Sequence, residues 1–131
     1  MKARYHGHRD KNHIPIANAL RKAGFSVADT SGAAGFVDLV VSGGHDLTVL
    51  IEVKQPNGDF GEDQLAFIGG WRGLVAIVTT IDEAFAVMAD CRLCLTANQK
   101  FALMALSVRV GQTKSGRVKY GVVKKLLEAH K

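Results

Sequence analysis

Apolar residues recur along the chain at two spacings, one typical of helices and the other of strands. In residues 10–23, Ile16, Ala19, Leu20 and Ala23 form an apolar stripe at helical spacing. Short runs rich in Val, Ile and Leu, bounded by glycine and polar residues, indicate strands instead. The pattern predicts helices at 10–23, 62–69, 81–90, 96–106 and 120–130, and strands at 25–30, 36–41, 47–54 and 73–79.

The order of these elements predicts the fold class. Residues 73–79 (GLVAIVT) form a continuous apolar run, as expected for a strand buried on both faces. Thr80 and Glu83 have the spacing of a helix capping box. Residues 107–110 fit either a strand or coil. The succession of helix, strands, helix, strand and helix predicts an α/β domain, in which helices flank a mixed sheet.

Length and composition are those of one globular domain that spans residues 1–131. Hydrophobic residues make up 47% of the chain, and no segment approaches the roughly 20 apolar residues of a membrane span. The amino terminus lacks the apolar run of a signal peptide, and Cys91 and Cys94 make no disulfide framework. We therefore expect a cytoplasmic protein without a membrane partner. The net charge of +5 permits a polyanionic partner.

Three charged residues lie inside the strand-forming segments. Asp38 is followed by an apolar run, and Glu52 and Lys54 end the next one. Because side chains alternate along a strand, Glu52 and Lys54 share one face of the sheet. If the two strands pair as a hairpin, Asp38 faces the same point. Buried charges are costly unless they pair or bind a metal, so this arrangement indicates a site.

Two carboxylates are the number that usually holds Mg²⁺ in a protein, with waters and substrate phosphates as the other ligands. Asp38 and Glu52 supply them, and the carbonyl of Val53 is a further candidate oxygen. Lys54 can position a water or stabilise developing charge. These residue types match metal-dependent phosphodiester hydrolysis. The alternative is a structural ion pair, in which Lys54 balances the acids.

The run from Gly35 to Lys54, GFVDLVVSGGHDLTVLIEVK, resembles the signature of the PD-(D/E)XK nuclease superfamily, with Val37 in place of the usual proline. The wider pattern resembles the small phage and bacterial nucleases of the VRR-NUC type, which are related to Holliday junction resolvases. It runs over about residues 10–89 and includes ALRKAGFSV, SGAAG and EDQLAFIGGW. The resemblance implies a restriction-endonuclease-like fold with a core at about 10–90, and residues 91–131 as an extension of open role.

The resemblance also implies roles for single residues. Asp38 and Glu52 would bind Mg²⁺ or Mn²⁺, Lys54 would be the catalytic lysine, and Gln64 would position Lys54 or the phosphate. Asp10 would complete the metal site. Ser31 would lie near the scissile phosphate. Arg9, Lys11 and Asn12 are further candidates for DNA contacts, the first two because their charge attracts the DNA backbone, and the alternative for these two is a solvated surface. The protein would be an endonuclease of a bacterial or phage-infected cell and would act on DNA as a homodimer.

Two other interpretations remain open at this point. The chain can be a catalytically inactive DNA-binding module on a nuclease fold, or a protein-interaction module, because a fold does not determine a function. His6, His8 and His13 are expected to belong to a solvated, basic amino terminus rather than to a metal site. Trp71, which lies just before a buried strand, is expected to serve in packing.

Overall fold

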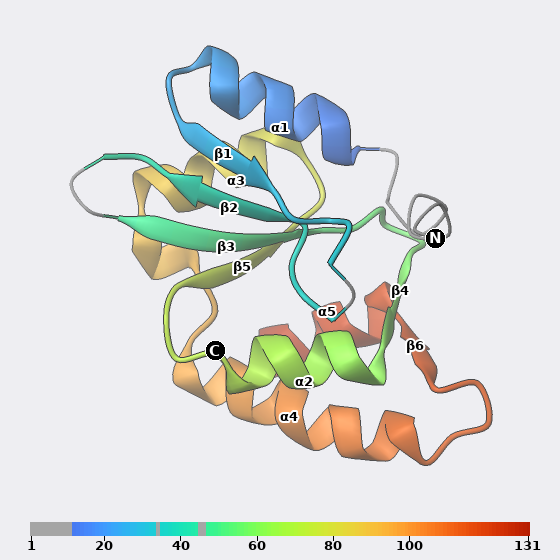
Figure 1. Cartoon of the computed structure of the whole chain (residues 1–131). Helices are drawn as coiled ribbons and strands as arrows, with labels where there is room; N and C mark the ends of the chain where they lie inside the picture. Colours follow the sequence, from blue (N-terminus) through green and yellow to red (C-terminus); the bar gives the residue numbers. More distant parts are fainter. Residues whose placement is uncertain (1–11, 34, 45–46) are drawn as a thin grey trace.

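A computed structural model of the chain describes residues 12–33, 35–44 and 47–131. Among these residues, helices lie on both sides of a central sheet, as Figure 1 shows. No helix in this part of the chain is long and apolar enough to cross a membrane. The elements are α1 (His13–Lys22), β1 (Ser26–Asp29), β2 (Leu39–Ser42), β3 (Thr48–Val53), β4 (Asp59–Gly61), α2 (Glu62–Gly70), β5 (Val75–Val78), α3 (Ile81–Ala89), the 3₁₀ helix η2 (Cys91–Leu93), α4 (Ala97–Gly111), β6 (Arg117–Lys119) and α5 (Tyr120–Ala129).

The central sheet is mixed, which confirms the predicted α/β class. Its strand order is β1-β2-β3-β5. The first three strands pair antiparallel, whereas β3 and β5 pair parallel. Parallel neighbours need a crossover between them, and α2 lies in that crossover.

The sheet separates two hydrophobic cores, and β3 contributes to both. Its odd-numbered residues Val49, Ile51 and Val53 pack into the core beneath α1 and α3. Leu50 points the other way and packs with Leu65 of α2. All four strand residues are buried, and a fully buried aliphatic side chain contributes about 1.5–3 kcal/mol relative to an exposed one. The sheet is therefore held from both faces.

The predicted helix starts at residues 80 and 96 are confirmed. The hydroxyls of Thr80 and Thr96 accept hydrogen bonds from the backbone N–H groups of Glu83 and Gln99, at 3.0 and 3.1 Å. The carboxylate of Glu83 accepts from the N–H of Thr79 at 2.6 Å, one residue earlier than the predicted capping box requires. Thr80 alone therefore satisfies the cap of α3.

The expectation of a strand or coil at 107–110 is wrong, because α4 continues to Gly111. Leu103, Leu106 and Val110 lie on its buried face, and this spacing keeps the apolar stripe continuous. After α4 the chain forms β6, which pairs antiparallel with β4 in a second, two-stranded sheet. Residues beyond 91 thus complete the second core, on the side of the sheet where α2 lies (Figure 1).

Candidate functional site

The three charged residues singled out in the sequence meet at one end of the central sheet. Asp38 directly precedes β2, Glu52 lies in β3, and Lys54 directly follows β3. The register pairs Leu39 with Ile51, and its extension by one residue places Asp38 opposite Glu52. Residues in such a pair have side chains on the same face. The register therefore places Asp38 and Glu52 on one face of the sheet, and Lys54 lies at the same end of β3.

Glu52 and Lys54 form a buried pair with Gln64 of α2. The Lys54 Nζ lies 3.6 Å from the Glu52 Oε2. The Gln64 side-chain amide donates from Nε2 to that carboxylate oxygen at 3.0 Å, and its Oε1 lies 3.5 Å from Nζ of Lys54. Its Oε1 also accepts from the backbone N–H of Gly61 at 3.0 Å, which fixes the amide orientation. Gln64 therefore contacts both members of the ion pair from the first turn of α2.

The Lys54 ammonium is held by the segment that follows it in the chain. Its Nζ donates to the carbonyl of Asp59 at 2.7 Å and lies 4.5 Å from the centre of the Phe60 ring. Glu52 is 2% exposed and Lys54 5% exposed. Removal of one partner from a buried ion pair typically costs about 3–5 kcal/mol, since the other charge is left without compensation. The burial of each of these two charges is therefore tolerated only because the other charge is present.

Asp59 is itself anchored by Arg117. The Arg117 guanidinium donates to the Asp59 Oδ1 from Nε at 2.9 Å and from Nη2 at 2.7 Å. Hydrogen bonding to Arg117 lowers the pKa of the Asp59 carboxyl, and partial burial opposes this shift. The carbonyl that holds Lys54 therefore belongs to a residue that β6 fixes in place.

Asp38 is oriented by the strand beside it. Its Oδ2 accepts a hydrogen bond from the backbone N–H of Val53 at 2.9 Å. This contact holds the Asp38 carboxylate at the end of β3, next to Val53, whose carbonyl is a candidate metal ligand. Asp38 and Glu52 thus present two carboxylates, as hard oxygen donors, at neighbouring positions of adjacent strands.

Asn12 connects the start of α1 to the same end of the sheet. Its side-chain amide donates to the carbonyl of Lys54 at 3.1 Å and to the carbonyl of Thr79 at 2.6 Å. These carbonyls follow β3 and β5, so Asn12 bridges two parallel strands at their carboxyl ends. The other predicted contributors from this region, Arg9, Asp10 and Lys11, lie outside the described residues.

Ser31 and His13 both lie close to Asp29, at the end of β1. The Ser31 hydroxyl and N–H donate to the Asp29 Oδ1 at 2.6 and 3.0 Å. The His13 Nε2 lies 3.3 Å from the same oxygen, and the residue is 1% exposed. The expectation that His13 belongs to a solvated terminus is wrong. The signal was in the sequence, because His13 precedes the buried residues Ile16 and Leu20 by three and seven positions.

The two cysteines do not extend the site. Both thiols are free, with Cys91 exposed and Cys94 buried. Burial raises the pKa of the Cys94 thiol to about 11, which keeps it protonated at neutral pH. In the part of the chain that the structure describes, no three His, Cys, Asp or Glu side chains come together as a metal-binding group.

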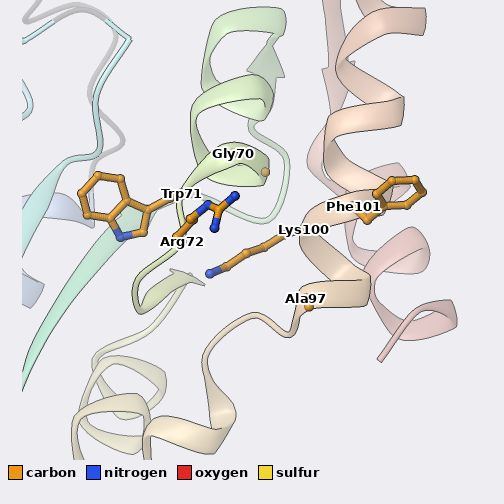
Figure 2. A pocket seen from close by; sticks show the side chains of 7 residues that line it. Gly70, Trp71, Arg72, Ala97, Lys100 and Phe101 are labelled. Atoms are coloured by element: carbon orange, nitrogen blue, oxygen red, sulfur yellow. The ribbon is translucent and has the colours of Figure 1, made fainter.

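An open cleft of about 590 Å³ lies at the carboxyl-terminal end of α2, between that helix and α4 (Figure 2). Arg72 and Lys100 extend into it, whereas Trp71 and Phe101 point to either side. The Trp71 ring stacks on Phe67 with a centroid separation of 5.5 Å, but the residue is 37% exposed and lines the cleft, so the expected packing involves only part of its surface. The Glu52 carboxylate lies at the opposite end of α2, next to Gln64, so the cleft is separate from the candidate site.

The candidate site thus rests on its own geometry, since neither family models nor curated proteins nor solved structures match this chain.

Proposed function

We propose that this protein is a Mg²⁺- or Mn²⁺-dependent DNA nuclease with a restriction-endonuclease-like fold, which hydrolyses phosphodiester bonds endonucleolytically. The observation that supports the proposal is the position of Asp38, Glu52 and Lys54 on one face of the sheet, at one end of two paired strands. In such an arrangement the two carboxylates can bind a divalent cation, and the adjacent ammonium can interact with a phosphate group. The net charge of +5 agrees with a polyanionic substrate.

The donor set fits a hard divalent cation. Asp38 and Glu52 would hold it through carboxylate oxygens, with the Val53 carbonyl and Asp10 as further candidates. When bound, such an ion stabilises charge on the phosphate and acidifies a water. Mn²⁺ accepts the same ligands, so both ions are candidates.

The chain's own residues supply position and charge. Lys54 lies next to Glu52, and its ammonium is held in place by the Asp59 carbonyl and Gln64. An ammonium held in this way places positive charge beside the carboxylates, where it can stabilise negative charge that develops on the phosphate. Gln64 fixes the Glu52 carboxylate, and Asn12 fixes the backbone carbonyl of Lys54. Preorganised positions of this kind lower the entropic cost of reaching the reactive geometry.

The burial of the ion pair favours a second candidate function. Because Glu52 is 2% and Lys54 5% exposed, the pair can serve the fold alone. The protein would then be a DNA-binding module without catalysis. Both candidates predict that the protein binds DNA. Only the nuclease predicts that a variant without one of the two carboxylates no longer cleaves DNA.

Cleavage of a panel of branched and linear DNAs, with Mg²⁺, Mn²⁺ or chelator, tests the proposal. We expect cleavage by the wild type with either ion and none with chelator. Asp38→Asn should abolish it, because the variant loses a carboxylate but keeps an oxygen that can accept from the Val53 N–H. Lys54→Met should do the same.

The matched control is Lys100→Met. Lys100 also donates from Nζ to a backbone carbonyl, that of Gly73 at 2.6 Å, but it lies in the distant cleft. The Lys100→Met variant should cleave DNA as the wild type does. Unchanged cleavage by a correctly folded Asp38→Asn protein would refute the nuclease proposal, and DNA binding without cleavage by the wild type would favour the second candidate.

The proposed assembly is a homodimer, because a C₂ pair presents two such sites to the two strands of a duplex. Sedimentation of the free protein tests this point. A monomer at all concentrations, with and without DNA, would contradict it.

A further inference from the structure

The segment 112–119 carries positive charge next to the candidate site. It contains Lys114, Arg117 and Lys119 and no acidic residue. In β6, Arg117 and Lys119 are exposed, while Val118 between them packs against the second core. Because side chains alternate along a strand, the two cations lie on the outer side of β6. The strand therefore presents its cations to solvent.

Hydrogen bonds and register connect this strand to the buried ammonium. Lys119 pairs with Asp59 across the two strands, and the Asp59 carbonyl accepts from Nζ of Lys54 at 2.7 Å. Paired residues of an antiparallel ladder have Cα atoms about 4.5–5.5 Å apart. The backbone of Lys119 thus lies one strand spacing from the residue that seats Lys54. A single nucleic-acid strand carries one negative charge per about 3.4 Å of helix axis, so a strand bound along β6 brings several phosphates past this surface.

The acidic group on the opposing strand is already neutralised. Arg117 donates two hydrogen bonds to Asp59, and its proximity contributes to the lowered pKa of that carboxyl. The remaining cations, Lys119 on β6 and Lys114 in the preceding loop, are both exposed. Glu62 and Asp63 in the first turn of α2 are exposed nearby, and Glu62 lies against Gly111 at the end of α4, so the positive charge that an anionic partner would meet is confined to the lysines of the segment itself. The hydrogen bond of 2.8 Å from the Tyr120 N–H to the Gly58 carbonyl holds the end of β6 against the segment before β4.

We propose that residues 112–119 form a docking surface for the DNA backbone, which positions the duplex so that a neighbouring phosphate reaches the Asp38–Glu52–Lys54 site. This inference rests on the proposed function and assigns part of its substrate binding to the carboxyl-terminal region. Lys114 and Lys119 supply the phosphate contacts, and Arg117 keeps the strand in place by its bonds to Asp59. Such contacts carry no sequence information, so the surface binds duplexes of any sequence.

Binding of a fluorescent DNA duplex in chelator, measured by anisotropy over a range of salt concentrations, tests the surface without cleavage. In the Lys114→Gln/Lys119→Gln variant we expect affinity to fall on the order of tenfold, and the slope of log K against log salt to become less steep by roughly two, one unit per lost phosphate contact. Both side chains are exposed, so the thermal unfolding midpoint should stay near that of the wild type.

The control variant Lys22→Gln/Arg72→Gln removes the same charge elsewhere. Lys22 ends α1 and Arg72 follows α2, and both are exposed. The Lys22→Gln/Arg72→Gln variant should bind the duplex with nearly the wild-type affinity and with nearly the same slope of log K against log salt. An equal loss in the two variants would overturn the proposal, because it would reveal a response to net charge alone.

Cleavage by the wild type separates this inference from the proposed function. If the wild type cleaves DNA and the Lys114→Gln/Lys119→Gln variant binds unchanged, the docking surface is wrong and the nuclease stands. If binding depends on these lysines but the wild type does not cleave in Mg²⁺ or Mn²⁺, the surface stands and the nuclease fails. A wild type that binds no DNA overturns both.

Discussion

The amino-terminal end of α2 differs from its carboxyl-terminal end in where charged side chains lie. Beside Gln64, at the first end, Glu52 and Lys54 are buried and joined by short contacts. At the second end, Arg72 and Lys100 extend into an open cleft (Figure 2). Exposed charges are solvated at little cost, whereas buried charges need partners. Burial together with opposite charges, rather than a visible hollow, is thus the feature that singles out the candidate site.

Lys54→Met should have the largest effect on stability. It removes one partner of the buried pair, and we expect the free energy of unfolding to fall by about 3–5 kcal/mol. Urea denaturation measures the change, with Lys100→Met as the control at the other end of α2. The double variant Glu52→Leu/Lys54→Met should recover part of the loss, since neither charge then remains unpaired. Equal costs for Lys54→Met and Lys100→Met would remove the distinction between the two ends.

Gly69→Ala should destabilise the carboxyl-terminal end by about 1–3 kcal/mol, as overpacked contacts do. A Cβ there would lie 2.8 Å from the Lys100 carbonyl oxygen and 2.8 Å from the Met104 backbone nitrogen, and neither can yield easily. Gly70→Ala is the matched control, because its Cβ would meet only the flexible Met104 Cε, at 3.2 Å. Thermal and urea unfolding should show a loss for the first variant alone. A neutral Gly69→Ala would mean that α2 and α4 can move apart freely.

The contact between Asp59 and Arg117 should make stability depend on pH near the amino-terminal end of α2. The folded-state pKa of Asp59 is lowered from 3.8, so its contribution is present above that value and is lost as the pH falls through the lowered pKa. Arg117→Met should remove this contribution. The difference in unfolding free energy between wild type and variant should be constant at neutral pH and should narrow below pH 3.8. Urea titrations at a series of pH values measure this difference, with Lys22→Met as the control. A difference in unfolding free energy that does not change with pH would contradict the stabilising role of the Asp59–Arg117 contact.

Arg72→Ala should have the smallest effect, within about 0.5 kcal/mol, as for exposed residues outside packed or paired sites. Thermal unfolding is sufficient to measure it. A cost above about 1 kcal/mol would show that the cleft holds its cations for structural reasons and would weaken the contrast between the two ends.

The sequence was sufficient for those features that depend on local periodicity. Residues 48–53 alternate between two buried faces, and this alternation already placed Glu52 and Lys54 on one side. The position of Asp38 required only that the two strands pair in a hairpin, and the register agrees. Gln64 was assigned by resemblance, and its contacts with Glu52 and Lys54 give that assignment a geometry, though its role stays a proposal.

Contacts between distant parts of the chain could not be predicted in this way. β4 and β6 each have three residues, too few for a recognisable alternation, and 55 residues separate Gly61 from Arg117 by their numbering. The bond from Asn12 to the Lys54 carbonyl likewise spans 42 positions. The burial of His13 was different, because its spacing to Ile16 and Leu20 was available and only the assumption of a solvated terminus hid it.

The pairing of β4 with β6 has a consequence for the order of events during protein synthesis. The carbonyl that accepts from the Lys54 ammonium lies in β4, and its ladder partner, residues 117–119, is synthesised only after the four strands of the central sheet. A nascent chain that ends before residue 117 lacks this support. Its central sheet can form, but β6 does not yet support the residue that holds Lys54, so the ion pair is completed only after residues 117–119 have been synthesised.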